Sequence, residues 1–163
     1  MLPAMSYAGD SGETSAIGVT ADSMRRVTMK SGTIGRFVAT GDVTRGQYGL
    51  YRWEMPASSG GAGGHFHRTF SEAFYVLDGA PSLYDGRAWT PGGPGDFLYV
   101  PEGGIHGFRN DTDTPATMLI LFAPGVAREA YFEELAEIGA SGRTMTKADW
   151  DALYARHDQV MVE

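Results

Sequence analysis

The sequence predicts an all-β protein, a sandwich or barrel of short antiparallel strands, with two α-helices near its C-terminal end. Its 23 glycines and 8 prolines separate short apolar runs, a composition typical of many tight turns between short strands. From residue 33 to residue 122 these runs recur about every ten residues, as expected for antiparallel strands. After Pro124 and Gly125 the apolar residues change to a helical spacing.

Short apolar runs are the candidates for the strands. They cover residues 33–40, 47–55, 73–77, 82–84, 97–100, 106–109 and 116–122. After the fourth of these runs, Asp85-Gly86 predicts a hairpin with a type I′ turn, because both central positions of that turn need a positive φ.

The segment after residue 125 predicts two amphipathic helices. In the first, apolar residues lie at helical spacing and a glycine follows as the stop: Tyr131, Phe132, Leu135, Ile138 and Gly139. The second begins at Thr146, whose hydroxyl can cap the free amides of the first turn, with Asp149 favourably placed near the helix N-terminus. It carries one stripe that we expect to pack on the β-domain or on a neighbouring subunit: Trp150, Leu153, Tyr154 and His157.

Composition and charge exclude several kinds of function. The chain has no cysteine, which excludes disulfides, thiolate zinc sites, iron–sulfur clusters and cysteine nucleophiles together. The formal net charge is −7 and the basic residues are scattered, so nucleic acid is not expected as a partner. Because the sequence has no signal-peptide pattern and no run of about 18 apolar residues, we expect a cytoplasmic protein without a membrane partner.

Three of the four histidines lie in two short blocks, residues 65–79 and 95–110. Side chains alternate between the faces of an extended strand, so His65 and His67 project to the same side. The next strand opens with Glu72, whose neighbours on the same face are Phe74 and Val76. A carboxylate on such an apolar face costs several kcal/mol unless it is paired, hydrogen-bonded or bound to a metal.

The second block supplies the third imidazole, since His106 opens a new strand after a turn at residues 101–104. Imidazole and carboxylate ligands suit a divalent transition metal, and Mn, Fe, Co, Ni, Cu and Zn all accept them. Such a set leaves room on the ion for water, dioxygen or a chelating substrate. We therefore expect one divalent metal on four ligands: His65, His67, Glu72 and His106.

The two blocks resemble the paired motifs of the cupin superfamily, small β-barrels with a metal in the mouth. The second block fits the pattern throughout, with its fixed positions at Gly95, Pro101, Gly103, His106 and Asn110. The first block has the histidine pair, then Glu72 and Gly79. It departs only at its opening, where the leading glycine of the family would fall at Ser59, beside Gly60 and Gly61.

This resemblance implies a single-domain cupin with a double-stranded β-helix, or jelly-roll, barrel. We expect an N-terminal arm over residues 1–25, either flexible or exchanged with a partner subunit. The barrel would cover residues 26–125, and a helical segment over 126–163 would pack on it or on a partner. Cupins commonly pair, so a homodimer is expected.

Aromatic residues suggest the kind of ligand. Tyr51, Trp53 and Met55 share one face of their strand, and Phe74 and Phe108 are expected on the face of the metal ligands. These residues form either ordinary core or an aromatic substrate pocket. A pocket with few fixed charges beyond the metal suits a flat aromatic or polyketide-like substrate better than a sugar phosphate.

Within the superfamily, the run HFHRTFSEAFYV at residues 65–76 is most similar to bacterial quercetin 2,3-dioxygenase-like proteins. This resemblance implies an oxidoreductase that opens a flavonol or similar enolic aromatic ring with dioxygen and releases carbon monoxide. The three histidines would hold the metal. Glu72 would bind it and, as the catalytic residue, accept the proton of the substrate hydroxyl.

Two other functions stay open. A metal-dependent cyclase or isomerase of a polyketide-like, enolisable substrate would use the same polarisation and proton transfer without dioxygen. A cupin that binds a small molecule without turnover is the third possibility, although such proteins often lack the family's metal ligands and here all four are present.

Overall fold

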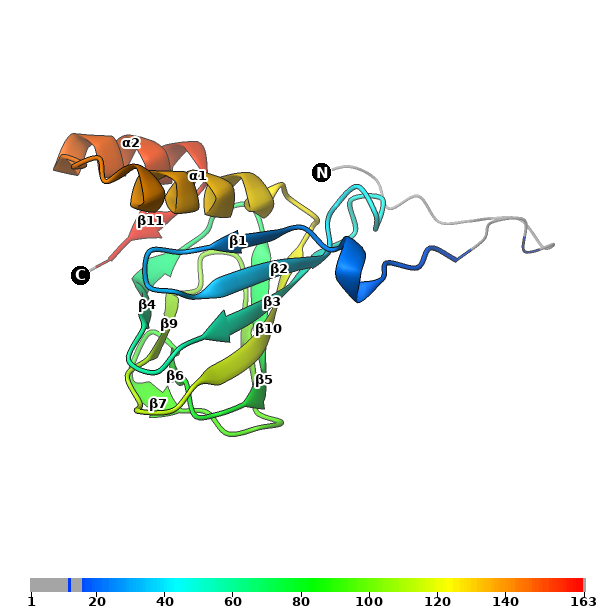
Figure 1. Ribbon diagram of the computed structural model, residues 1–163, viewed down its shortest axis with the longest axis horizontal. Coiled ribbons are helices and arrows are strands. Elements are labelled where there is room, and N and C mark those ends of the chain that lie inside the picture. Colours follow the sequence, from blue (N-terminus) through cyan, green and yellow to red (C-terminus); the bar gives the residue numbers. More distant parts are fainter. Residues whose placement is uncertain (1–11, 13–15, 163) are drawn as a thin grey trace.

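The computed structural model describes Gly12 and residues 16–162, and shows two β-sheets with two helices across one end (Figure 1). Its strands are β1 (Arg26–Thr28), β2 (Ile34–Ala39), β3 (Gly49–Met55), β4 (Gly60–Phe66), β5 (Ser71–Asp78), β6 (Ser82–Tyr84), β7 (Trp89–Pro91), β8 (Phe97–Val100), β9 (His106–Asn110), β10 (Ala116–Ala123) and β11 (Val160–Met161). The helices are α1 (Arg128–Ser141) and α2 (Lys147–Arg156), preceded far upstream by a 3₁₀ turn at Ala21–Ser23.

All strand pairs are antiparallel and form a jelly roll of two sheets. The larger sheet has the order β1-β2-β3-β10-β5-β8, and the smaller has the order β11-β4-β9-β6-β7. Within the described residues no ladder joins the two sheets, so the expected barrel is a sandwich that hydrogen bonds do not close. The fold class is nevertheless that predicted from the sequence.

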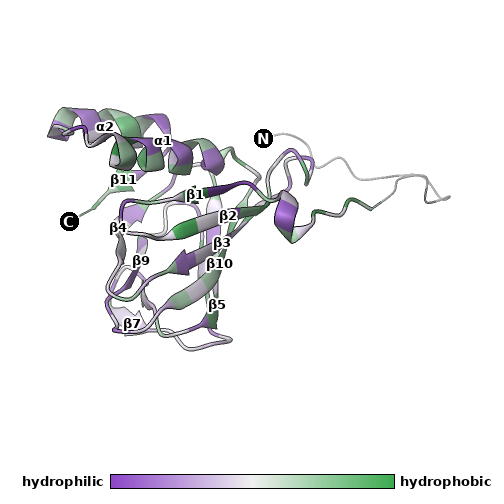
Figure 2. Ribbon diagram, viewed as in Figure 1, coloured by the Kyte–Doolittle hydropathy of each residue, from purple (hydrophilic) through white to green (hydrophobic). Residues whose placement is uncertain are grey.

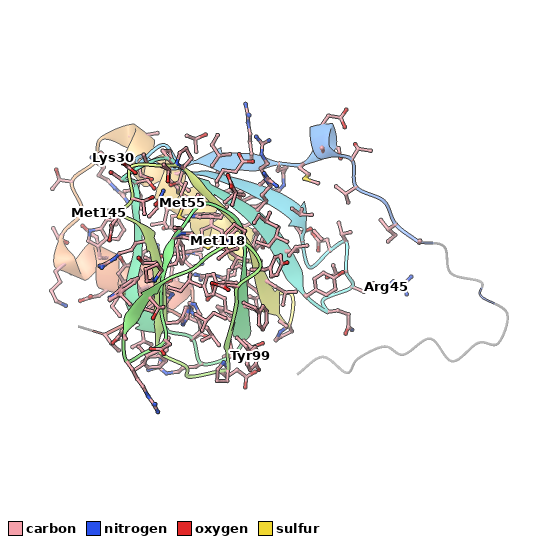
Figure 3. The ribbon with its side chains drawn as sticks, turned by 90° about the horizontal axis from the view of Figure 1, so that it is seen from below. Lys30, Arg45, Met55, Tyr99, Met118 and Met145 are labelled. Carbon is pink, nitrogen blue, oxygen red and sulfur yellow. The ribbon has the colours of Figure 1, made fainter. Side chains whose placement is uncertain are left out.

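The core lies between the two sheets. Strand β10 is central in the larger sheet, where Ile120 faces Tyr51 of β3 and Phe74 of β5, and all three side chains are fully buried. Met55 and Met118 also lie in this interior (Figure 3). Buried and half-buried residues alternate along β3 and β10, which is the period-two pattern of strands that face a core on one side.

Each apolar run identified in the sequence forms a strand, but β4 was not among those runs. Four of its seven residues are glycines, so it lacks the apolar alternation that marks a strand. One of these glycines has a packing reason: a Cβ on Gly61 would lie 2.0 Å from the carbonyl oxygen of Phe108 in β9. Strands β4 and β9 therefore approach each other too closely for a larger residue.

The hairpin at Asp85-Gly86 is present, but the predicted type I′ turn is wrong. Of the two residues only Gly86 has a positive φ, at 88°. The Asp85 carboxylate instead accepts hydrogen bonds from the backbone N–H groups of Arg87 and Ala88. The turn is longer than two residues, since β6 ends at Tyr84 and β7 begins at Trp89, and the Asp85 side chain stabilises it.

The second helix begins as predicted and the first does not end as predicted. Thr146 caps α2, and Asp149 completes a reciprocal capping box with it. Helix α1 continues through Gly139 and ends at Gly142, whose φ of 66° is left-handed. Gly139 has a packing role, since a Cβ there would lie 3.0 Å from the Cβ of Lys30.

Most of the predicted N-terminal arm cannot be compared, because residues 1–11 and 13–15 lie outside the described residues. Between Thr20 and Met24 the chain makes the single 3₁₀ turn and buries no residue there. In the described part of the chain, neither helix is long and apolar enough to cross a membrane, and both carry hydrophilic as well as hydrophobic residues (Figure 2).

Asn110, the last fixed position of the second motif, joins two turns. Its fully buried amide donates to the carbonyl oxygens of Pro56 and Thr114, each at 2.9 Å. Its Oδ1 accepts from the N–H and hydroxyl of Thr112. The residue thus ties the β3–β4 turn to the β9–β10 turn.

We predict that Asn110→Ala lowers the free energy of unfolding by about 2–4 kcal/mol, because it leaves buried carbonyl groups without donors. Denaturant unfolding measures the change. Asp113→Ala alters an exposed residue of the same turn and is the control, with an expected change within about 0.5 kcal/mol. Equal losses in the two variants would contradict the structural role of Asn110.

Candidate metal centre

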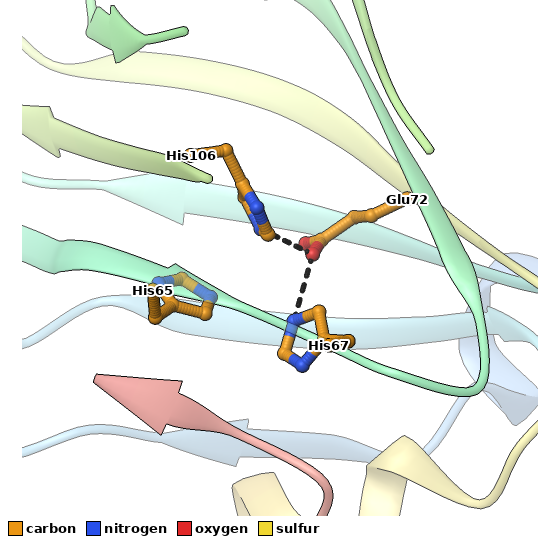
Figure 4. A group of neighbouring side chains, drawn as sticks. All are labelled: His65, His67, Glu72 and His106. Carbon is orange, nitrogen blue, oxygen red and sulfur yellow. Dashed lines mark hydrogen bonds and ion pairs between the residues drawn. The ribbon is translucent and has the colours of Figure 1, made fainter. Parts of the chain in front are cut away.

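The four expected metal ligands come together between the two sheets. One ligand atom from each of His65, His67, Glu72 and His106 lies within 4.8 Å of the others, and all four residues are buried. Figure 4 shows His67 and His106 directed at Glu72, with His65 beside them. His65 of β4 pairs with His106 of β9 in the smaller sheet, whereas Glu72 lies on β5 of the larger sheet.

Backbone carbonyl groups hold the three imidazole rings in one tautomer. Each Nδ1 lies at hydrogen-bond distance from a carbonyl oxygen, which can only accept, so each Nδ1 donates its hydrogen. The distances are 2.7 Å from His65 to Gly63, 2.6 Å from His67 to Asp158 and 3.0 Å from His106 to Gly104. In the neutral rings the Nε2 lone pairs are therefore free to bind a metal.

The protonation states follow from burial and from these contacts. Burial alone would raise the pKa of the Glu72 carboxyl, but the hydrogen bonds with His106 and His67 outweigh it and hold that pKa well below its usual range. Burial lowers the pKa of His65 to about 4, so this imidazole is neutral at neutral pH. Burial also opposes protonation of His106, but its hydrogen bond with Glu72 raises the pKa overall.

The donor set fits a divalent cation. The Oε2 atom of Glu72 lies 2.7 Å from Nε2 of His106 and 3.1 Å from Nε2 of His67. With both Nδ1 atoms already protonated, these short contacts need a positive charge, either a proton on the imidazole or a metal ion among the ligand atoms. Nitrogen and oxygen ligands lie about 2.0–2.2 Å from such an ion, which agrees with four atoms gathered this closely.

A cavity of about 350 Å³ reaches this cluster at His65 and Glu72. Of the five residues expected in a substrate pocket, Trp53, Met55 and Phe108 line it. Tyr51 and Phe74 do not belong to its lining, because both are fully buried in the core. Phe74 packs behind the centre, with its ring 5.8 Å from that of His106.

The C-terminal segment forms much of the cavity wall, which the sequence did not reveal. The lining includes Arg128, Tyr131 and Phe132 of α1, Trp150 and Tyr154 of α2, and Gln159. The helical segment was expected to pack on the β-domain or on a partner subunit. In the structure the helices pack on the β-domain and leave a space beside the candidate ligands, a property that depends on how the helices dock and has no local sequence signal.

Asp158, between α2 and β11, couples the C-terminal segment to the centre. Its carbonyl oxygen accepts the hydrogen bond from His67, and its carboxylate accepts from the N–H groups of Arg68 and Thr69 and from the Thr69 hydroxyl. Its φ of 50° is left-handed. Asp158 therefore orients the candidate ligand His67 and stabilises the turn that follows His67 in the chain.

Residues 51–122 match the family model of the cupin domain. The match includes all four candidate ligands and both central strands of the larger sheet. This part of the chain is therefore similar to a cupin domain, in agreement with the fold and with the motif resemblance.

Known proteins similar to this chain include quercetin 2,3-dioxygenase of Bacillus subtilis, which is 30% identical over 139 residues. The alignment covers 82% of this chain and 36% of that protein, so the chain spans about a third of its relative's length. A cupin-superfamily sugar phosphate isomerase of Silicibacter pomeroyi is 25% identical, with a TM-score of 0.56 over 66% of this chain and 75% of that one. The polyketide cyclase RemF of Streptomyces resistomycificus is 21% identical, with a TM-score of 0.56 over 66% and 78% of the two chains.

We predict that the protein purified without added metal contains roughly one divalent ion per chain, and that His106→Ala loses most of it. Elemental analysis by mass spectrometry measures the content. His157→Ala is the matched control, since His157 is the one histidine outside the cluster and contacts Glu134 instead. Retention of metal in His106→Ala, or equal loss in His157→Ala, would contradict the assignment.

We also predict that Asp158→Ala weakens metal affinity by about tenfold, because the turn that follows His67 loses the carboxylate that accepts its hydrogen bonds, although the backbone carbonyl that contacts His67 is kept. Titration of the metal-depleted protein with Co²⁺ or Ni²⁺ measures the affinity. Asp151→Ala removes a carboxylate from the exposed face of α2 and is expected to leave it unchanged. The same affinity in both variants would show that Asp158 does not act on the centre.

Proposed function

We propose that this chain is a metal-dependent dioxygenase that opens a flavonol or a similar enolic aromatic ring. The observation that carries the proposal is the cavity, whose aromatic walls end directly on His65 and Glu72. Its volume of about 350 Å³ is within the range of small-molecule sites. The similarity to the Bacillus subtilis protein named quercetin 2,3-dioxygenase supports the same chemistry.

Each part of the site has a role in this proposal. His65, His67, Glu72 and His106 would hold the metal, which supplies Lewis acidity and a template for a chelating substrate. Glu72 is ionised at neutral pH because its pKa is low, so one carboxylate oxygen can accept the proton of the substrate hydroxyl. Trp53 and Phe108 would orient a flat ring beside these groups and exclude water.

A cyclase or isomerase is the second candidate. The same carboxylate could move a proton on an enolisable polyketide-like substrate without any use of dioxygen. The shared fold with the polyketide cyclase RemF is compatible with this function. The presence of a proton acceptor at the end of a cavity with aromatic walls favours it as much as it favours the dioxygenase.

We predict that Glu72→Gln lowers kcat with quercetin by about 100-fold or more while metal content falls less than in His106→Ala. The amide can still offer an oxygen to the ion but cannot take up a proton. Oxygen uptake and elemental analysis of both variants measure the two effects. Equal metal loss in Glu72→Gln and His106→Ala would remove the support for a proton-accepting role.

The use of dioxygen separates the two enzymes. Oxygen uptake and carbon monoxide release with quercetin support the dioxygenase, whereas turnover of an enolisable substrate under strict anaerobiosis supports the cyclase or isomerase. A metal-loaded protein that binds such ligands and converts none would instead be a binding cupin. The homodimer and the cytoplasmic location stay predictions, to be checked by solution mass measurement and cell fractionation.

A further inference from the structure

One charged residue of the cavity has no role in the proposed metal chemistry. Arg128, the first residue of α1, lines the cavity and is only 4% exposed. Its guanidinium donates to the carbonyl oxygen of His157 at 2.8 Å and to the side-chain oxygen of Gln159 at 3.1 Å. Among the described residues no carboxylate pairs with it, and its Nε has no hydrogen-bond partner.

Aromatic rings surround this buried cation. The ring centroid of Tyr131 lies 4.1 Å from its central carbon, and those of Phe70, Phe122 and Phe132 lie 5.4–5.6 Å away. Ring faces offset only part of the desolvation of a guanidinium, and two neutral acceptors occupy two of its five N–H groups. A buried cation whose desolvation is only partly offset attracts an anion that enters the cavity.

The sign of the charge in the cavity is opposite to that of the protein. The formal net charge of the chain is −7. The Asp, Glu, Lys and Arg residues that line the cavity are Lys30, Arg128 and Glu72, two cations against one anion. Lys30 is exposed and lies near Met55 in the view of Figure 3. A divalent ion at the metal centre would make the cavity more positive still.

We propose that this cavity selects planar aromatic ligands that carry a negative charge, a carboxylate or an ionised phenol, and that Arg128 supplies the attraction. The inference rests on the proposed function, because it names the substrate class of that same cavity. Arg128 acts here on ligand choice rather than on the reacting atoms. Its contacts with His157 and Gln159 hold the guanidinium in the wall, and its buried Nε makes no hydrogen bond among the described residues.

The test compares two probes of nearly the same shape, cinnamate and cinnamamide, of which only the first is charged. Quenching of tryptophan fluorescence reports binding, because Trp53 and Trp150 both line the cavity. The titrations are made on the metal-loaded and the metal-depleted protein. We expect cinnamate to bind about tenfold more tightly than cinnamamide in both forms, the size expected of a charge-assisted contact.

Three variants test whether Arg128 is the source of the preference for cinnamate over cinnamamide. Arg128→Gln should abolish it, and Arg128→Lys should retain most of it. Arg87→Gln makes the same change of net charge at the exposed β6–β7 turn and should leave the preference intact. If Arg128→Gln does not fold, Arg128→Met serves instead, because the apolar methionine side chain keeps contacts with the surrounding aromatic rings.

Equal affinity for the two probes in the wild-type protein would overturn the inference. A preference that survives in Arg128→Gln, or that disappears once the metal is removed, would also overturn it, since the metal or Lys30 would then be the source. Failure of the proposed function gives a different result. In that case the protein binds cinnamate selectively through Arg128 but takes up no oxygen with quercetin.

Discussion

The carboxylate of Glu72 is buried between two sheets, and within the described residues its hydrogen-bond partners are imidazole nitrogens. A charge in that position is tolerated only if opposite charge lies against it. Much of the surrounding structure meets this demand. Strand β5 places the carboxylate on the inner face, the close approach of β4 and β9 places His65 opposite His106, and backbone carbonyl groups turn the rings so that Nε2 faces inward.

This arrangement explains why the ligands could be predicted from the sequence. Strand alternation places His65 and His67 on one side without knowledge of the fold, and a glutamate followed by apolar residues on its own face implies a compensating cation. The cap of α2 was equally local, since Thr146 and Asp149 recognise each other across one turn. Features set by neighbouring residues were therefore visible in the sequence.

Features set by contacts between distant segments were not visible. Gly61 of β4 lies against the backbone of Phe108, and Gly139 of α1 lies against Lys30. Tyr51 shares a face with Trp53 but packs among Phe37, Phe122 and Phe132 rather than in the cavity. Alternation identifies the inward face of a strand, but it cannot distinguish filled interior from cavity wall.

The cavity combines two parts of the chain that have separate tasks. The candidate metal ligands belong to the β-domain, whereas Arg128, Trp150 and Gln159 belong to the segment that follows it. Substitutions in the helices would therefore change the wall of the cavity and leave the four candidate ligands in place. Asp158 sets a limit to this freedom, because its backbone carbonyl accepts the hydrogen bond from His67 and its carboxylate holds the turn that follows His67. A protein of this form can diverge in its cavity wall while it keeps the buried cluster.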